Sequence, residues 1–152
     1  MKLATALSER ADIQKRITEL QTRLNNNAKV QEGEEPAEDP KALLREMDGL
    51  LQRLEWLMAR INLTNSKTSY KGVTLTELIA RRDCLTKRLK VMRSFLDAAS
   101  AKVDRYSQKE IKILSSVKVS ELQKQVDASA RELRQVDETI QSLNWTTDLP
   151  EA

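Results

Sequence analysis

The sequence predicts an all-α protein, in the form of an antiparallel four-helix bundle of the coiled-coil type with an extended arm before the last helix. Aromatic residues make up only 3% of the 152 residues, and glycine and proline occur three times each, whereas sheet proteins are rich in aromatic residues and turn formers. Aliphatic residues recur at alternating intervals of three and four along four segments, which is the spacing of a helix that packs along one face. A chain of this length suits one core, so residues 1–152 are expected to form a single helical domain.

The first half of the chain predicts two helices separated by an acidic loop. The first helix is expected over about residues 3–30 and the second over about 41–62, with the loop at 33–40 between them. Asp39 is a good helix cap and Pro40 is tolerated in a first helical turn, so both favour a helix start there. The second helix has an apolar stripe of double width and is therefore expected to be the most buried. The stripe residues are Leu3, Ala6, Ile13, Ile17, Leu20 and Leu24 in the first helix, and Leu43, Met47, Leu50, Leu54, Leu57 and Ile61 beside Leu44, Leu51 and Met58 in the second.

The second half predicts two further helices, over about 75–106 and 120–144. A capping box, in which the side chains of Thr74 and Glu77 bond each other's backbone N–H groups, marks the start of the third helix. Trp145 follows the fourth helix. We interpret it as a hydrophobic plug over one end of the bundle, with an aromatic-lined ligand pocket as the alternative.

The composition argues against catalysis. The chain has no histidine, which removes the usual general base and the commonest metal ligand. Its single cysteine, Cys84, excludes an intramolecular disulfide, and we interpret it as a small packing residue. We therefore expect no enzyme, no catalytic residues, no metal site and no cofactor. No uncharged apolar run approaches the roughly 18 residues of a membrane span, so a cytoplasmic protein without a membrane partner is expected.

One polar cluster is a candidate ligand site. In an antiparallel bundle the end of the second helix and the start of the third lie together, and polar residues gather at both. Arg82 occupies a stripe position, where an aliphatic residue is expected. A buried arginine needs a carboxylate partner, so Arg82 either binds an anion or small ligand, or pairs with a nearby carboxylate or a partner subunit; we favour the pairing. The residues of this candidate site are Asn62, Asn65, Glu77, Arg81, Arg82 and Asp83.

Charge is uneven along the chain. Residues 66–119 contain 13 lysines and arginines against 5 aspartates and glutamates, whereas residues 120–152 contain 3 against 7. A basic helix can bind nucleic acid through phosphate contacts. The basic residues of the third helix are nevertheless scattered around it, and aromatic residues for stacking on bases are scarce. We expect these charges to pair with the acidic fourth helix, in this subunit or the next, and we do not expect a nucleic-acid partner.

Residues 107–119 are a candidate oligomer interface. Apolar and polar residues alternate there with a period of two, which predicts the extended arm, with a short hairpin around Ser115 and Ser116 as an alternative. An extended apolar segment has unpaired backbone groups that a symmetry mate can satisfy, so a homo-oligomer is expected. In the competing interpretation the arm folds back over its own bundle. The interface residues of this hypothesis are Tyr106, Ile111, Ile113, Val117 and Val119.

Four strings resemble one family of small bacterial proteins. They are LATALSERAD at the start, RINLTN after the second helix, TLTELIARRD at the start of the third and QSLNWTTDL near the end. Together they resemble the septicolysin-like family of uncharacterised helical proteins, and the resemblance extends over nearly the whole chain. Its name implies a membrane-damaging cytolysin, but the resemblance supplies no catalytic residues.

The expected function is therefore that of a bacterial cytoplasmic helical-bundle protein that acts through self-association or partner binding, without catalysis. Two alternatives remain. The membrane-damaging activity is implied by the family name alone, and nucleic-acid binding is suggested only by the local excess of positive charge.

Overall fold

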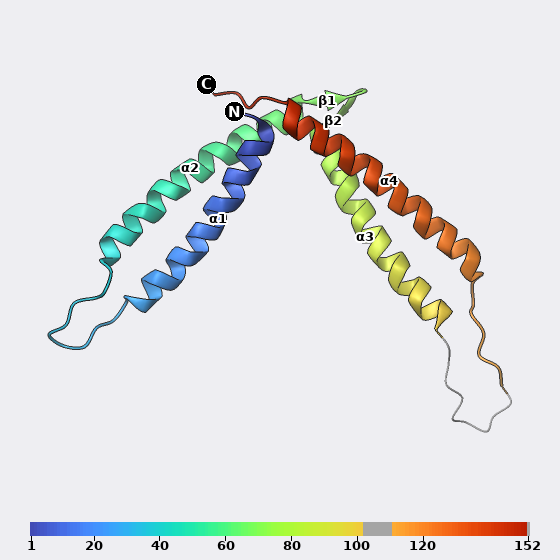
Figure 1. Ribbon diagram of the computed structural model, residues 1–152, viewed down its shortest axis with the longest axis horizontal. Coiled ribbons are helices and arrows are strands. Elements are labelled where there is room, and N and C mark those ends of the chain that lie inside the picture. The colour runs from blue at the N-terminus through green and yellow to red at the C-terminus, as the bar shows by residue number, and fades with distance from the viewer. Residues whose placement is uncertain (102–110, 152) are drawn as a thin grey trace. The chain divides into compact units, whose positions relative to one another are not determined.

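The structure is a computed structural model that describes residues 1–101 and 111–151, and it confirms the all-α class (Figure 1). The four helices contain 24, 28, 26 and 28 residues. The β-structure in the described ranges is a hairpin of two short strands and one isolated bridge. In chain order the elements are α1 (Leu3–Asn26), α2 (Pro40–Lys67), β1 (Ser69–Tyr70), β2 (Val73–Thr74), α3 (Leu75–Ser100) and α4 (Val119–Thr146).

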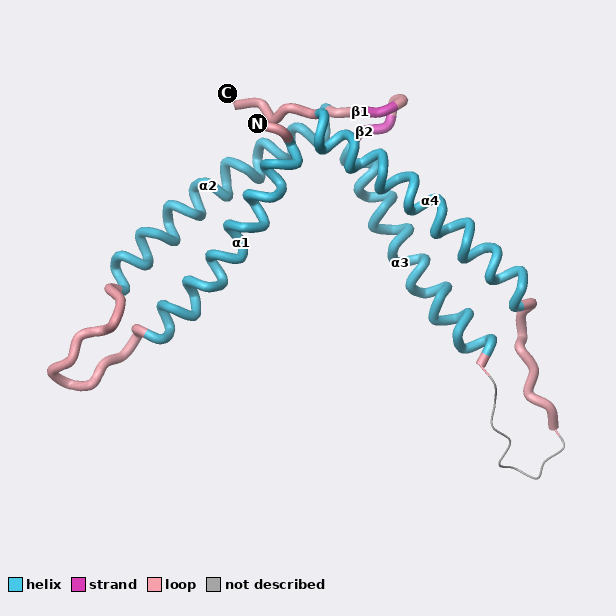
Figure 2. The backbone as a smooth tube through the Cα atoms, viewed as in Figure 1, coloured by secondary structure: helices cyan, strands magenta, loops and turns pink. Residues whose placement is uncertain are grey.

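The first compact unit comprises residues 1–75 and 141–152. Its main feature is the antiparallel hairpin of α1 and α2, which lie side by side in Figure 2. The predicted stripes supply the buried side chains, because residues three and four apart share one helix face. Those buried residues are Leu3, Ala6, Ile13 and Leu20 from α1 and Leu43, Leu57 and Ile61 from α2.

The C-terminal segment pairs with the start of the chain inside this first unit. The Leu3 N–H donates to the Thr147 carbonyl at 2.9 Å, and the Leu149 N–H donates to the Met1 carbonyl at 2.8 Å. Lys2 and Asp148 form an antiparallel bridge in the backbone and an ion pair at 2.9 Å between their side chains. Leu149 is buried, so both backbone and apolar contacts hold this segment.

The second compact unit comprises residues 76–140, which include most of α3 and α4. These two helices form a second antiparallel hairpin (Figure 1). Its core cluster consists of Leu89, Leu96, Leu122 and Val126, with Met92, Val117, Val119, Ala130 and Leu133 packed against it. The helix pairing within each unit is antiparallel, as predicted. The closure of all four helices into one bundle, and hence a single domain over residues 1–152, stays a prediction.

Several predicted boundaries differ from the structure. α1 ends at Asn26 rather than near residue 30, because Asn27 leaves helical geometry and its amide bonds the Arg23 carbonyl. α2 continues to Lys67 instead of ending near residue 62, because the Thr64 hydroxyl donates to the Arg60 carbonyl at 2.7 Å and so stays inside the helix. α3 is described to Ser100, so the predicted end at 106 lies outside the described residues. α4 begins at Val119 and ends at Thr146, one residue before and two residues after the predicted bounds.

The segment between the second and third predicted helices, for which the sequence predicts no regular structure, contains the β1–β2 hairpin. Tyr70 pairs with Val73, and the two residues between them, Lys71 and Gly72, both have positive φ, of 50° and 82°. Two consecutive residues with positive φ form the tight turn that matches the twist of a hairpin. Strands of two residues are too short to show a period in the sequence, which explains why the sequence does not predict this hairpin.

The double stripe of α2 is not buried across its whole width. Leu44, Leu51 and Met58 are exposed, whereas Leu57 and Ile61 on the neighbouring stripe are fully buried. Within the first unit α2 therefore packs along one stripe only. The expectation that both stripes of α2 are buried is wrong for the stripe formed by Leu44, Leu51 and Met58.

Candidate functional site

The predicted ligand cluster is distributed over two units. Asn62 and Asn65 lie in the last turns of α2 in the first unit, Asn62 exposed and Asn65 half-buried. Glu77 and three further charged residues lie in the first turns of α3 in the second unit. Asn62 and Asn65 thus belong to one unit and Glu77 and Asp83 to the other, and a ligand site formed by all of them stays a prediction.

The arginines of this cluster have carboxylate partners inside their own unit. Arg81 pairs with Glu132 of α4, across the α3–α4 hairpin. The half-buried Arg82 pairs with the adjacent Asp83, with 3.3 Å between its Nη2 atom and the Asp83 Oδ1 atom. These contacts agree with the pairing interpretation of Arg82. They also agree with the expectation that basic residues of the third helix meet the acidic fourth.

The predicted interface residues have different environments. Ile111 and Ile113 are exposed, whereas Val117 and Val119 pack against the core cluster of the α3–α4 hairpin. Val119 is the first residue of α4 rather than part of an arm. Residues 111–118 form neither a strand nor a hairpin, and Tyr106 lies outside the described residues. The outer part of the segment is thus available for an interface, and its inner part belongs to the subunit's own core.

Two single-residue interpretations were wrong. Cys84 was predicted to be a packing residue but is exposed on α3. Trp145 was predicted to cover the end of the bundle but is 65% exposed at the end of α4. Both lie beside their helix's apolar stripe rather than on it, and the spacing alone does not decide whether a neighbour covers such a position.

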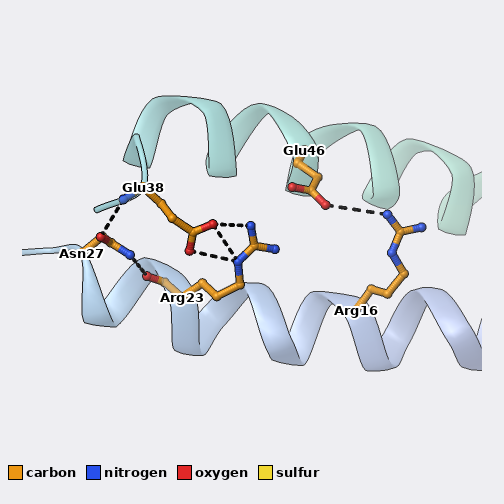
Figure 3. A network of polar contacts seen from close by, with 5 residues as sticks. All are labelled: Arg16, Arg23, Asn27, Glu38 and Glu46. Carbon is orange, nitrogen blue, oxygen red and sulfur yellow. Dashed lines mark hydrogen bonds and ion pairs between the residues drawn. The ribbon is translucent and has the colours of Figure 1, made fainter. Parts of the chain in front are cut away.

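A ladder of three ion pairs, which the sequence did not predict, connects α1 to α2. Arg53 donates to both carboxylate oxygens of Glu9, at 2.6 and 3.0 Å. Arg16 pairs with Glu46 at 3.6 Å, and Arg23 pairs with Glu38 at 2.5 Å (Figure 3). Glu9, Arg16 and Arg23 are seven residues apart along α1, so they share one face. That spacing was visible in the sequence, but the carboxylate and guanidinium partners could be assigned only from the register of the two helices.

Asn27 extends the ladder at the loop end of the hairpin. Its side-chain amide donates to the Arg23 carbonyl at 2.8 Å, and its side-chain oxygen accepts from the Glu38 backbone N–H at 3.0 Å (Figure 3). Asn27 thereby caps α1 and fixes the residue that pairs with Arg23. The acidic loop predicted over 33–40 is thus attached to α1 through Glu38.

The ladder perturbs the acidity of its members. Hydrogen bonds from the Arg53 side chain hold the pKa of Glu9 below its ordinary value, and those from Arg23 do the same for the pKa of Glu38. The pKa values of Arg53 and Arg23 are raised by the same hydrogen bonds. The pKa of Asp148 is lowered by its hydrogen bond with Lys2. These shifts describe structural ion pairs and not a proton-transfer site, because each carboxylate is held in its charged form.

A third feature of the first unit is an aromatic and cationic cluster on α2. The Arg53 guanidinium lies 4.7 Å from the centroid of the Trp56 ring, and that of Arg60 lies 5.0 Å from it. Positions 53, 56 and 60 are three and four residues apart, which places them on one side of the helix. The sequence shows this spacing, but it does not show that both guanidinium groups lie over the Trp56 ring.

The described residues contain no group of three or more cysteine, aspartate and glutamate side chains placed to hold a metal ion. Within 1–101 and 111–151, no helix combines the length and the apolar character needed to cross a membrane.

The structure defines a class of protein: an all-helical chain of two antiparallel hairpins, with charged residues paired within each hairpin. The sequence matches a family of unknown function, DUF6847, over residues 10–149, and the chain belongs to that family. It is also similar to a solved structure, the crystal structure of a functionally unknown conserved protein from Corynebacterium diphtheriae. That similarity has a TM-score of 0.91 and 42% sequence identity, and it covers 99% of each chain. Among curated proteins, none matches this sequence.

The resemblance to the septicolysin-like family is therefore wrong. The family match over residues 10–149 and the similar crystal structure both concern proteins of unknown function, and neither indicates a septicolysin. The membrane-damaging activity was implied by that name alone, so it loses its basis. Short matching strings such as TLTELIARRD carried the resemblance, and helix-capping and charged residues of this kind recur in unrelated helical proteins.

Proposed function

We propose that this protein acts by self-association through residues 111–114, without catalysis. The observation that carries the proposal is the exposure of three large apolar side chains in a short stretch next to α4. Ile111, Ile113 and Leu114 are 75%, 66% and 78% exposed. Adjacent exposed apolar residues favour burial against another protein, since their transfer out of water is favourable.

The position of this segment supports the proposal. Its inner end is anchored, because Val117 and Val119 pack against the core of the α3–α4 hairpin. A shallow cavity of about 260 Å³ lies between the segment and the end of α3, lined by Phe95, Ala98, Ile113 and Leu114 among others. A second copy could place its own apolar segment there, and a two-fold arrangement would bury both copies equally.

Other features are consistent with a binding protein. The outer stripe of α2, formed by Leu44, Leu51 and Met58, is a second exposed apolar surface. The lack of histidine and the single cysteine leave few groups for catalysis. Binding of a different protein through the same apolar segment is the second candidate. The cytoplasmic location expected from the sequence belongs to this proposal.

Light scattering coupled to size exclusion tests the proposal. At micromolar concentration we expect a mass of at least twice the 17.4 kDa of the chain. Replacing Ile111 and Ile113 with serine should reduce the mass to that of the monomer and leave the far-UV circular dichroism unchanged. Val91→Ser, which removes an exposed apolar residue from α3, is the matched control and should leave the mass unchanged. A monomeric wild-type protein would contradict self-association.

A further inference from the structure

Arg60 lies against an aromatic ring and has no acidic partner among the residues that the structure describes. Its guanidinium lies over the Trp56 ring at 5.0 Å, as that of Arg53 does at 4.7 Å. Arg53 also binds both oxygens of Glu9. In the described part of the chain, Arg60 has neither an ion pair nor a side-chain hydrogen bond. The Nε atom of Arg60 is buried and has no hydrogen-bond partner. Among the described residues that are not exposed, no other buried side-chain nitrogen or oxygen lacks a partner.

The register of the α1–α2 ladder explains why Arg60 lacks a carboxylate. Along α1 the paired residues advance by seven, from Glu9 to Arg16 to Arg23. Their partners step back from Arg53 and Glu46 in α2 to Glu38, which lies two residues before α2. Continued one step toward the N-terminus, the same register places position 2 of the chain opposite position 60.

Position 2 is occupied by a lysine, which cannot neutralise an arginine. Two carboxylates of the C-terminal segment lie near this end of the chain, and both pair with other cations: Asp148 with Lys2 at 2.9 Å, and Glu151 with the amino group of Met1 at 3.1 Å. Lys2 and the amino group of Met1 are each matched by one carboxylate, so the charge of Arg60 is the one left unmatched among these three described cations.

The Nε atom of Arg60 is buried, so an anion can reach this guanidinium only through its two Nη groups, which have no hydrogen bond among the described residues. An arginine uses its flat face against an aromatic ring and its N–H groups, which lie in the plane, for bidentate bonds to a carboxylate or phosphate. Arg53 shows this combination two turns earlier, with its guanidinium over the Trp56 ring and its Nε and Nη2 atoms on Glu9. Arg60 has the same ring contact without the carboxylate.

We propose that Arg60, oriented by Trp56, is a binding site for a carboxylate group of an acidic peptide segment. The Arg53–Glu9 pair shows that this face of α2 accommodates a carboxylate beside the same ring, and we therefore choose a carboxylate as the ligand and phosphate as the competing outcome. The site is independent of the apolar segment at 111–114. It also lies on the opposite edge of α2 from Leu51 and Met58, since successive helix residues are about 100° apart.

The test is isothermal titration of the full chain with a hexaglutamate peptide, a hexaglutamine peptide and inorganic phosphate. We expect saturable binding of hexaglutamate and none of hexaglutamine. Arg60→Gln should weaken binding by about tenfold or more, as expected for loss of a charge-assisted hydrogen bond. Arg60→Lys keeps the positive charge but loses the planar guanidinium, so its affinity for hexaglutamate should lie between those of the wild type and Arg60→Gln. Arg45→Gln removes an exposed arginine of the same helix and is the matched control, with less than about a twofold effect expected from loss of surface charge alone.

A second measurement separates binding from a structural role of Arg60. In ¹⁵N spectra the side-chain Nε–H signal of Arg60 should shift on addition of hexaglutamate, while that of Arg45 should not. Circular dichroism shows whether the variants keep their helical content. The proposal is overturned if hexaglutamate does not bind, if the Arg60→Gln and Arg45→Gln proteins bind it equally, or if phosphate binds at Arg60 and hexaglutamate does not.

Discussion

At the scale of the residue, Gly49 and Gly72 have different backbone conformations: Gly49 is helical and Gly72 has a positive φ. Gly72 has a φ of 82° in the turn between β1 and β2, a conformation that side chains with a Cβ atom adopt at a cost. Gly49 lies inside α2, where an alanine Cβ atom would meet no atom outside its own helix within 4 Å. The same replacement should therefore have effects of opposite sign at the two positions.

We expect Gly72→Ala to lower the free energy of unfolding by about 1 kcal/mol, because alanine is strained at positive φ. Gly49→Ala should raise it by about 0.5–1 kcal/mol, because alanine loses less conformational entropy than glycine in a helix. Urea denaturation monitored by circular dichroism measures both. Changes of the same sign in the two variants would contradict this assignment of the backbone.

The two apolar stripes of α2 provide a second residue-scale comparison. Leu57 is 0% exposed, whereas Leu51 is 41% exposed on the neighbouring stripe. Leu57→Ala should lower the free energy of unfolding by about 2–5 kcal/mol, through lost burial and the cavity left behind. Leu51→Ala should change it by less than about 1 kcal/mol, since the wild-type side chain is only partly removed from water. Equal losses in urea denaturation would mean that another surface covers the outer stripe.

At the scale of the element, the α1–α2 ladder couples stability to pH. The pKa of Glu9 is lowered in the folded chain from an ordinary value of 4.5. As pH falls, this carboxylate is therefore protonated in the unfolded chain before it is protonated in the folded chain. The contribution of this carboxylate to stability is therefore complete above about pH 4.5 and is lost as pH falls through the lower value of the folded state. Because the Glu9–Arg53 pair is partly exposed, its contribution to the free energy of unfolding is below about 1 kcal/mol.

Glu9→Gln should lower the melting temperature at pH 7 and have a smaller effect at pH 3. Below the ordinary pKa of 4.5 the carboxylate of the unfolded chain is protonated, so part of the contribution of Glu9 to stability is already lost there. Glu55→Gln, which changes an exposed residue of α2 that has no ion pair among the described residues, is the control. Thermal melts at the two pH values, at low ionic strength, measure the difference. An Glu9→Gln effect that grows on acidification would contradict the sign derived from the lowered pKa.

The elements also show what the sequence could and could not predict. The stripes of α1 and α2 were predictable because each buried residue, such as Leu20 or Ile61, lies three or four positions from the next. The β1–β2 hairpin was not, because its strands have two residues each and Lys71 is not a typical residue for positive φ. The ladder was missed because Glu9, Arg16 and Arg23 resemble an ordinary solvated face until the register of α2 assigns their partners.

The candidate site was harder to predict than the fold for the same physical reason. Asn62 and Arg82 were grouped from an assumed arrangement of helix ends, which is a long-range property that helix periodicity does not encode. The pairing of Arg81 with Glu132 needed only the local register of one hairpin, and the expected charge pairing of α3 with α4 is seen there. The stacking of Arg53 and Arg60 on Trp56 depends on rotamers, which the sequence leaves open.

At the scale of the whole molecule, charge balance governs the response to acid. The chain contains 26 lysines and arginines and 23 aspartates and glutamates, which gives a formal net charge of +3 at pH 7. Protonation of the carboxylates leaves the positive charges without partners. It also breaks the pairs of Glu9, Glu38 and Glu46 in the first unit and that of Glu132 in the second. Both hairpins then lose favourable pairs while their self-repulsion rises.

We expect the protein to lose most of its helical content at pH 2 in low salt, and to recover a large part of it when chloride is added to about 0.5 M. At that ionic strength the screening length falls to about 4 Å, interpolated between 8 Å at 0.15 M and 3 Å at 1 M, so repulsion between exposed cations is largely removed. The apolar stripes, which do not titrate, can then drive helix packing again. Far-UV circular dichroism at pH 2, with and without salt, measures both steps. A spectrum at pH 2 in low salt that equals the one at pH 7 would show that apolar burial alone holds both hairpins.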